Sequence, residues 1–171
     1  AEPFDMGKLV PEIKKRNELD TLSEGAVHQG VVAFCTPYVY REIGVLLDRR
    51  SGFLKNDLVL ILDSIMDPQN LGSIIRSAYG LGANGVIIPA DRAAGITPAV
   101  IKASAGSALQ MPVARVTNLS QTIDDLKARG FWIYGADIHA ETDLRDVDFC
   151  RRVALVLGGE AKGIRPLLKK K

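Results

Sequence analysis

An uninterrupted apolar run at residues 58–62, Leu-Val-Leu-Ile-Leu, constrains the fold of this chain more than any other feature. The run shows no alternation of polar and apolar residues, and it ends at Asp63. Such a run is typical of a strand that is buried on both faces, as in the middle of a parallel sheet. Later apolar segments at 86–88, 113–116, 131–134 and 153–157 predict four further strands of the same sheet.

Helical patterns separate these strands. Apolar residues recur at helical spacing after the first strand, at Leu71, Ile74, Ile75, Ala78 and Leu81. Residues 97–109 begin with Thr-Pro, an N-cap followed by proline at the first helical position. Residues 119–129 have Ser120 at their start and are followed by Gly130, so that Arg129-Gly130 forms a helix stop. This alternation predicts an α/β protein with a parallel sheet, helices on both faces, and a ligand site at the carboxyl ends of the strands.

The first fifty residues follow another pattern. Residues 8–20 are polar and helix-prone, and residues 30–35 predict a short strand. About fifty residues form a poor independent domain. We interpret residues 1–35 as the end of a larger N-terminal domain or as a packing arm, 36–56 as a linker that is clearest at 51–57, and 57–171 as the main domain.

Composition excludes several classes of protein. With 47% hydrophobic and 25% charged residues, the 171-residue chain is not disordered. No apolar stretch is long enough for a membrane span, and the first residues do not resemble a signal peptide. Cys35 and Cys150 lie far apart and predict neither a disulfide framework nor a zinc site. We therefore expect a cytoplasmic protein without a metal.

The net charge of +2 hides a local asymmetry. Residues 137–148 hold five acids and one base, whereas seven bases and one acid follow from Arg151 onward. This basic block is suited to binding phosphate groups. The solvent-exposed C-terminal end of a helix would carry the same charges.

Three loops at the predicted sheet edge carry the candidate chemistry, at 63–72, 135–137 and 157–163. Asn70 is placed to cap the following helix. Arg76 points away from the apolar stripe, so it faces either solvent or a substrate. Glycines after a strand allow a ligand to approach the backbone, or simply make a tight turn. No dinucleotide-binding glycine motif follows the first strand. We interpret His28, a lone histidine before a predicted strand, as structural.

The order of motifs resembles the SpoU (TrmH) family of RNA ribose methyltransferases. Residues 67–83, with Asp67-Pro68-x-Asn70-x-Gly72-x-x-x-Arg76, are similar to the family's first motif. Residues 157–164, Leu-Gly-Gly-Glu-x-x-Gly-Ile, are similar to its second. Residues 104–108 resemble the helix between these two motifs. Residues 25–31 resemble the end of the family's RNA-recruiting domain, which is itself similar to a ribosomal protein.

The resemblance implies a trefoil-knotted fold, a homodimer, and methyl transfer from S-adenosylmethionine to a ribose 2′-hydroxyl in RNA. It is closest to the branch that methylates a guanosine of large-subunit ribosomal RNA. The implied catalytic residues are Asn70, Arg76 and Glu160. The implied cofactor-binding residues are Gly135, Ala136, Leu157, Gly158 and Gly159. We further expect RNA contacts from His28, Arg92, Lys102 and Arg165.

The family's third motif does not follow the second before Lys171. We therefore expect a chain ending there to bind the cofactor weakly and to be largely monomeric. Other interpretations stay open: methylation of a transfer RNA ribose, a nucleotide-binding protein that holds phosphates in the 158–163 loop, and a non-catalytic RNA-binding module.

Overall fold

The computed structural model describes residues 10–48 and 57–171, which belong to two compact units divided between Pro37 and Tyr38. The first unit contains helix α1, Arg16–Leu22, which overlaps the helix-prone segment 8–20. The strand predicted at 30–35 is wrong, because residues 10–37 contain no strand. A strand needs a hydrogen-bonded neighbour, and this part of the chain offers none, so Val31 and Phe34 are exposed.

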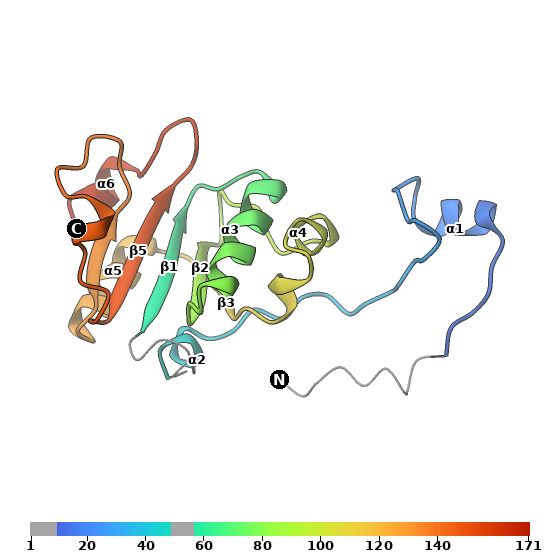
Figure 1. Cartoon of the computed structure of the whole chain (residues 1–171), viewed down its shortest axis with the longest axis horizontal. Helices are drawn as coiled ribbons and strands as arrows, with labels where there is room; N and C mark the ends of the chain where they lie inside the picture. Colours follow the sequence, from blue (N-terminus) through green and yellow to red (C-terminus); the bar gives the residue numbers. More distant parts are fainter. Residues whose placement is uncertain (1–9, 49–56) are drawn as a thin grey trace. The chain divides into compact units, whose positions relative to one another are not determined.

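A five-stranded parallel sheet forms the centre of the second unit, with the order β3-β2-β1-β5-β4. Its strands are β1 (Leu58–Asp63), β2 (Gly85–Pro89), β3 (Val113–Val116), β4 (Trp132–Gly135) and β5 (Val153–Gly158). All five predicted strands are confirmed, and none of their ends differs from the prediction by more than one residue. The run at 58–62 is the central strand β1, as its continuous apolar character predicted (Figure 1).

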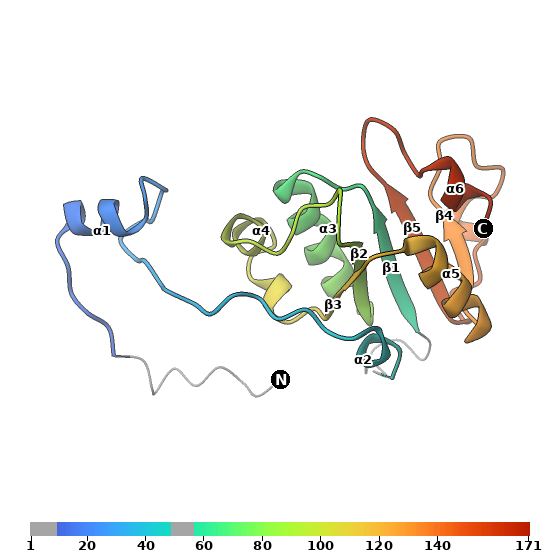
Figure 2. The ribbon, with the colours of Figure 1, turned by 180° about the vertical axis from the view of Figure 1, so that it is seen from behind.

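Successive residues of β1 point into two separate cores. Val59 and Ile61 pack on one face, which is covered by α2 (Ile43–Asp48), α5 (Leu119–Ala128) and α6 (Pro166–Lys169) (Figure 2). Leu60 and Leu62 pack on the other face, under α3 (Pro68–Gly80) and α4 (Pro98–Ala103) (Figure 1). Each fully buried side chain of this size contributes about 1.5–3 kcal/mol, so both layers are held to the sheet by burial.

Two helices differ from the prediction at their ends. The helix expected at 97–109 stops at Ala103, because Ala105 (φ 51°) and Gly106 (φ 83°) are left-handed, and a short 3-10 helix, η2 (Ser107–Leu109), follows. Helix α5 is capped by Asn118 rather than by a serine, and the Asn118 side chain accepts a hydrogen bond from the Gln121 amide at 3.1 Å. The predicted stop of α5 at Arg-Gly is confirmed.

Residues 38–48, within the segment interpreted as a linker, pack against the sheet. The Tyr38 hydroxyl donates to the Met111 carbonyl at 3.1 Å, and the Arg41 amide donates to the Val113 carbonyl at 2.8 Å. Leu46 is fully buried in the core. Residues 51–56, the clearest linker composition, lie outside the described residues, and the domain boundaries at 35 and 57 stay predictions.

Candidate active site

The carboxyl ends of β1 and β5 bring two motif residues together. Asp63 and Gly158 are paired in the parallel register of these strands, so the loops that follow them are neighbours. Asn70, in the first turn of α3, donates a hydrogen bond from its side-chain amide to Glu160, in the loop after β5. Two of the three predicted catalytic side chains are therefore in direct contact.

Asn70 is not the cap of helix α3. The N-cap is Asp67, whose carboxylate accepts a hydrogen bond from the Gln69 amide at 2.9 Å, and Pro68 occupies the first helical position. The helix begins three residues earlier than an Asn70 cap would place it, since proline at the first position suits a helix start. The Asn70 side chain is thereby left to reach Glu160.

The capping assignment makes a stability prediction. We expect Asp67→Ala to lower the free energy of unfolding by about 1 kcal/mol, because the Gln69 amide loses its acceptor. We expect Asn70→Ala to change it by less than about 0.5 kcal/mol, as for a surface residue without a capping role. Urea denaturation of both variants checks this, and a larger loss from Asn70→Ala would contradict the assignment.

Arg76 lies on the exposed side of α3, opposite the buried residues Leu71, Ile75 and Ala78. This confirms that its side chain leaves the core. Among the described residues the Arg76 side chain has no hydrogen-bond or ion-pair partner, so its guanidinium is available to an external anion. Arg76 lies six positions after Asn70, about 9 Å along the helix axis, and no contact joins Arg76 to the Asn70–Glu160 pair.

Gly158 and Gly159 are required by packing within the chain. A Cβ at Gly158 would lie 2.0 Å from the Gly163 carbonyl carbon and 2.2 Å from the Ile164 nitrogen. A Cβ at Gly159 would lie 2.6 Å from the Ser64 carbonyl oxygen. The chain's own backbone can therefore pack against these two positions only because neither carries a Cβ, and the cofactor-binding role of Gly158 and Gly159 stays a prediction.

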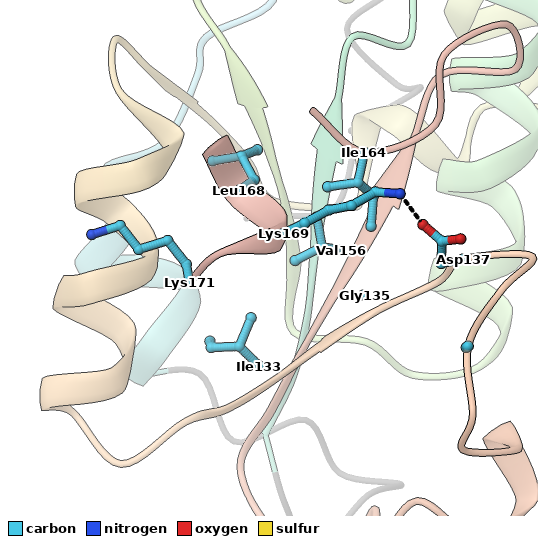
Figure 3. A pocket seen from close by; sticks show the side chains of 9 residues that line it. Ile133, Gly135, Asp137, Val156, Ile164, Leu168, Lys169 and Lys171 are labelled. Carbon is cyan, nitrogen blue, oxygen red and sulfur yellow. Dashed lines mark ion pairs between the residues drawn. The ribbon is translucent and has the colours of Figure 1, made fainter. Parts of the chain in front are cut away.

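A cavity of about 280 Å³ lies beside the ends of β4 and β5. Its walls are mainly apolar, with Ile133, Val156, Ile164 and Leu168 around Gly135 (Figure 3). Gly135 is the one predicted cofactor-binding residue that lines this cavity. Ala136, Gly158 and Gly159 do not line it, and Leu157 lines a separate apolar groove beside α3.

An ion pair between Lys169 and Asp137 spans one side of the cavity (Figure 3). The hydrogen bond from Lys169 lowers the pKa of Asp137 below its ordinary value, and the His139 amide, 3.0 Å from the Asp137 carboxylate, lowers it further. A carboxyl group whose pKa is lowered by folding stabilises the folded state at pH values above its ordinary pKa. That stabilisation disappears as the pH falls through the lower, folded-state pKa.

The pH dependence of this pair can be measured directly. We expect Lys169→Ala to raise the pKa of Asp137, because the largest stabilising partner of the carboxylate is removed. The value should stay below that of an unfolded aspartate, since the His139 amide remains. Lys170→Ala, a change at the neighbouring exposed lysine, serves as the control and should leave the pKa of Asp137 unchanged. NMR titration of the side-chain carboxyl carbon measures both, and equal values in all three proteins would contradict the pairing.

His28 has two partners in the first unit. Its Nε2 lies 2.9 Å from the Asp20 carboxylate, and its Nδ1 accepts a hydrogen bond from the Gly30 amide at 3.0 Å. The His28 side chain is only 7% exposed. These contacts favour the structural interpretation of His28, and its role in RNA binding stays a prediction.

The basic residues proposed for RNA contact divide into two kinds. Arg92 and Lys102 are exposed on the second unit. Arg165 instead donates from Nε to the buried carboxylate of Asp63 at 2.7 Å. Sequence reasoning treated Asp63 only as the end of a strand. The signal that it missed was a charged residue that directly continues a fully buried apolar run.

Two classes of site are not found in the part of the chain that the structure describes. Residues 10–48 and 57–171 contain no group of histidine, cysteine, aspartate and glutamate side chains arranged to hold a metal ion. Within the same residues, no helix is long and apolar enough to cross a membrane.

Comparison with known proteins agrees with this fold and these motifs. The model of the SpoU rRNA Methylase family matches residues 57–171, and a second model, RNA 2'-O ribose methyltransferase substrate binding, matches residues 7–41. The chain therefore belongs to the SpoU methylase family, which confirms the resemblance seen in its motifs.

Two relatives whose names describe tRNA/rRNA methyltransferases match most of this chain. YacO of Bacillus subtilis, named for the TrmH family of tRNA/rRNA methyltransferases, is 45% identical over 91% of this chain. The tRNA/rRNA methyltransferase slr0955 of Synechocystis, whose name marks it as uncharacterized, is 42% identical over 96% of it. The chain spans 62% of the length of the first relative and 42% of the second.

A solved structure supports the fold class. The SpoU methyltransferase AviRb from Streptomyces viridochromogenes, in complex with AdoMet, superposes with a TM-score of 0.67 at 29% identity. The match covers 75% of this chain and 49% of AviRb. The parallel α/β fold of this family is thereby confirmed, while the trefoil knot stays a prediction.

Proposed function

We propose that this chain carries the catalytic part of an S-adenosylmethionine-dependent RNA ribose 2′-O-methyltransferase. The contact between Asn70 and Glu160 is the observation that carries the proposal. It joins the two family motifs at the carboxyl edge of a parallel sheet, where such sheets bind ligands. The match of residues 7–41 to a substrate-binding model supports an RNA substrate.

The residues around the cavity fit the adenosyl part of S-adenosylmethionine. Ile133, Val156, Ile164 and Leu168 offer apolar walls to a flat base, and Gly135 leaves the main chain accessible. Ligand sites commonly combine such walls with a few polar groups, here Asp137 and Lys169. When bound, this cofactor supplies an electrophilic methyl group.

The chain's own polar residues have separate tasks in this proposal. Glu160 accepts a hydrogen bond from Asn70 and so fixes the orientation of that amide at the sheet edge. Arg76 remains protonated, because a guanidinium does not lose its proton under ordinary conditions. We assign it to the phosphate beside the reacting ribose, where its charge lowers the cost of forming the 2′-alkoxide.

The finer substrate assignment also belongs to this proposal. We propose a guanosine of large-subunit ribosomal RNA, modified by a cytoplasmic homodimer. The name of the matched family supports ribosomal RNA. The names of the relatives include both transfer and ribosomal RNA, so transfer RNA remains the alternative substrate.

Methyl transfer tests the proposal. Purified protein is incubated with methyl-labelled S-adenosylmethionine and either ribosomal or transfer RNA, and the RNA is digested to nucleosides for mass spectrometry. We expect label on the ribose of guanosine from ribosomal RNA. Label on a base would refute ribose chemistry, and label only in transfer RNA would refute the substrate. RNA binding without any transfer would favour a non-catalytic module, and binding of ATP without S-adenosylmethionine would favour a nucleotide-binding protein.

A further inference from the structure

Asp63 is a fully buried carboxylate whose two oxygens are both engaged. Its Oδ2 accepts a hydrogen bond from the Arg165 amide at 2.8 Å, and its Oδ1 accepts from Arg165 Nε at 2.7 Å. The Ser64 hydroxyl donates to the same Oδ1 at 3.1 Å. A buried charge is tolerated when it is paired and hydrogen-bonded in this way. The burial of the Asp63 carboxylate therefore depends on its contacts with Arg165.

Asp63 also forms a hydrogen bond with the start of the loop that ends at Arg165. The Gly159 amide donates to the Asp63 main-chain carbonyl at 2.9 Å. Inside the loop, the Gly163 amide donates to the Gly159 carbonyl at 2.8 Å and closes it on itself. The segment 159–165, which we call the Glu160 loop, is thus fastened at both ends to one residue, and Glu160 directly follows the first attachment.

We propose that Asp63 is a positioning residue, which through Arg165 holds the Glu160 loop in the place where Glu160 meets Asn70. The catalytic consequence rests on the function proposed above. The mechanical consequence, a loop that opens when the Asp63 carboxylate is lost, does not. Arg165, which the sequence suggested for RNA contact, thereby acts on the loop from within the protein.

The opposite ends of the same two strands provide a matched control. Asp57 precedes β1 and pairs with Arg152, which precedes β5, at 2.7 Å between Oδ2 and Nε. The Asp57 carbonyl accepts from the Val153 amide at 2.8 Å, just as the Asp63 carbonyl accepts from Gly159. The Asp57 side chain is 17% exposed. This pair joins β1 to β5 in the same way but lies at the amino ends of the strands, away from the Glu160 loop.

Hydrogen exchange of Asp63→Asn and Asp57→Asn tests the proposal. Asparagine keeps the shape of aspartate but removes the charge, and it turns an NH₂ group toward one of the Arg165 donors. In Asp63→Asn we expect the amides of Gly163 and Arg165 to exchange about tenfold faster or more at neutral pH, because the loop opens locally. In Asp57→Asn those two amides should exchange as in the unchanged protein, although both variants melt at a lower temperature.

Kinetics of the same two variants give the catalytic readout. We expect kcat for methyl transfer to fall about tenfold or more in Asp63→Asn, with a smaller change in KM for RNA, because a displaced Glu160 affects the reacting geometry more than RNA capture. Asp57→Asn should keep the kcat of the unchanged protein. If the unchanged protein transfers no methyl group, the proposed function fails, and the exchange experiment still decides the role of Asp63.

Protected loop amides in Asp63→Asn would overturn the proposal, and so would equal acceleration in both variants. If Asp63→Asn does not fold, Arg165→Lys replaces it. This change keeps the positive charge and the hydrogen bond from the main-chain amide at position 165 to the Asp63 carboxylate, but it removes the Nε donor. Loop amides that exchange faster in Arg165→Lys than in Asp57→Asn support the positioning role, and equal exchange refutes it.

Discussion

Gly158→Ala is expected to lower the free energy of unfolding by about 3 kcal/mol, near the upper end for an overpacked site. The added methyl would lie 2.0 Å from the Gly163 carbonyl carbon and 2.2 Å from the Ile164 nitrogen. Both neighbours are main-chain atoms, so no side chain can rotate to make room. The Glu160 loop has to move away from β5, and we expect methyl transfer to be lost with it.

Gly80→Ala is the control for this experiment. Gly80 is the last residue of α3, and a Cβ there would meet no atom within 4 Å. We expect this variant to be as stable as the unchanged protein or more stable by about 0.5 kcal/mol, since alanine restricts the unfolded chain. Urea denaturation compares the two variants. A Gly158→Ala protein with unchanged stability would show that Gly163 and Ile164 do not pack on β5.

Arg76→Ala is expected to lower kcat/KM for RNA methylation about a hundredfold or more, the range seen when a single stabilising donor is removed from an active site. The affinity for S-adenosylmethionine should stay within a few-fold, because Arg76 does not line the cavity beside β4 and β5. The free energy of unfolding should change by less than about 0.5 kcal/mol, since the side chain is exposed. Steady-state kinetics, calorimetric titration and urea denaturation measure the three quantities.

Lys127→Ala provides the comparison for the loss of one exposed cation from a helix. Lys127 lies on α5, on the other face of the sheet from α3, and is also exposed. We expect this variant to keep its methyl transfer activity. A large loss of stability in Arg76→Ala would assign a structural role to Arg76, and unchanged kinetics would remove it from the proposed mechanism.

The sheet could be predicted because each of its strands is marked by a local apolar run. Residues 58–62 are apolar at every position, and the observed β1 pairs with a strand on each side and faces a core above and below. Burial of this kind selects the residue type at each position, so the signal lies within five or six neighbouring residues.

Helix starts were less predictable, because two side chains near one start can both serve as a cap. Asp67 and Asn70 are both suitable caps. Asp67 is the observed cap because Pro68 occupies the first helical position. The strand expected at 30–35 failed for a different reason. Its apolar pattern is local, but a strand exists only when a neighbour pairs with it.

Sequence alone determined the α/β class, the five strands and the family, because these depend on short apolar runs and on motifs of nearby residues. Tertiary structure decided which functional side chains meet. Asn70 and Glu160 are 90 residues apart, and Asp63 and Arg165 are 102 apart. They are neighbours because β1 and β5 pair in parallel with Asp63 opposite Gly158, so the two loops leave the same edge of the sheet together. No local pattern encodes that register, which follows from packing the whole sheet between its two helical layers.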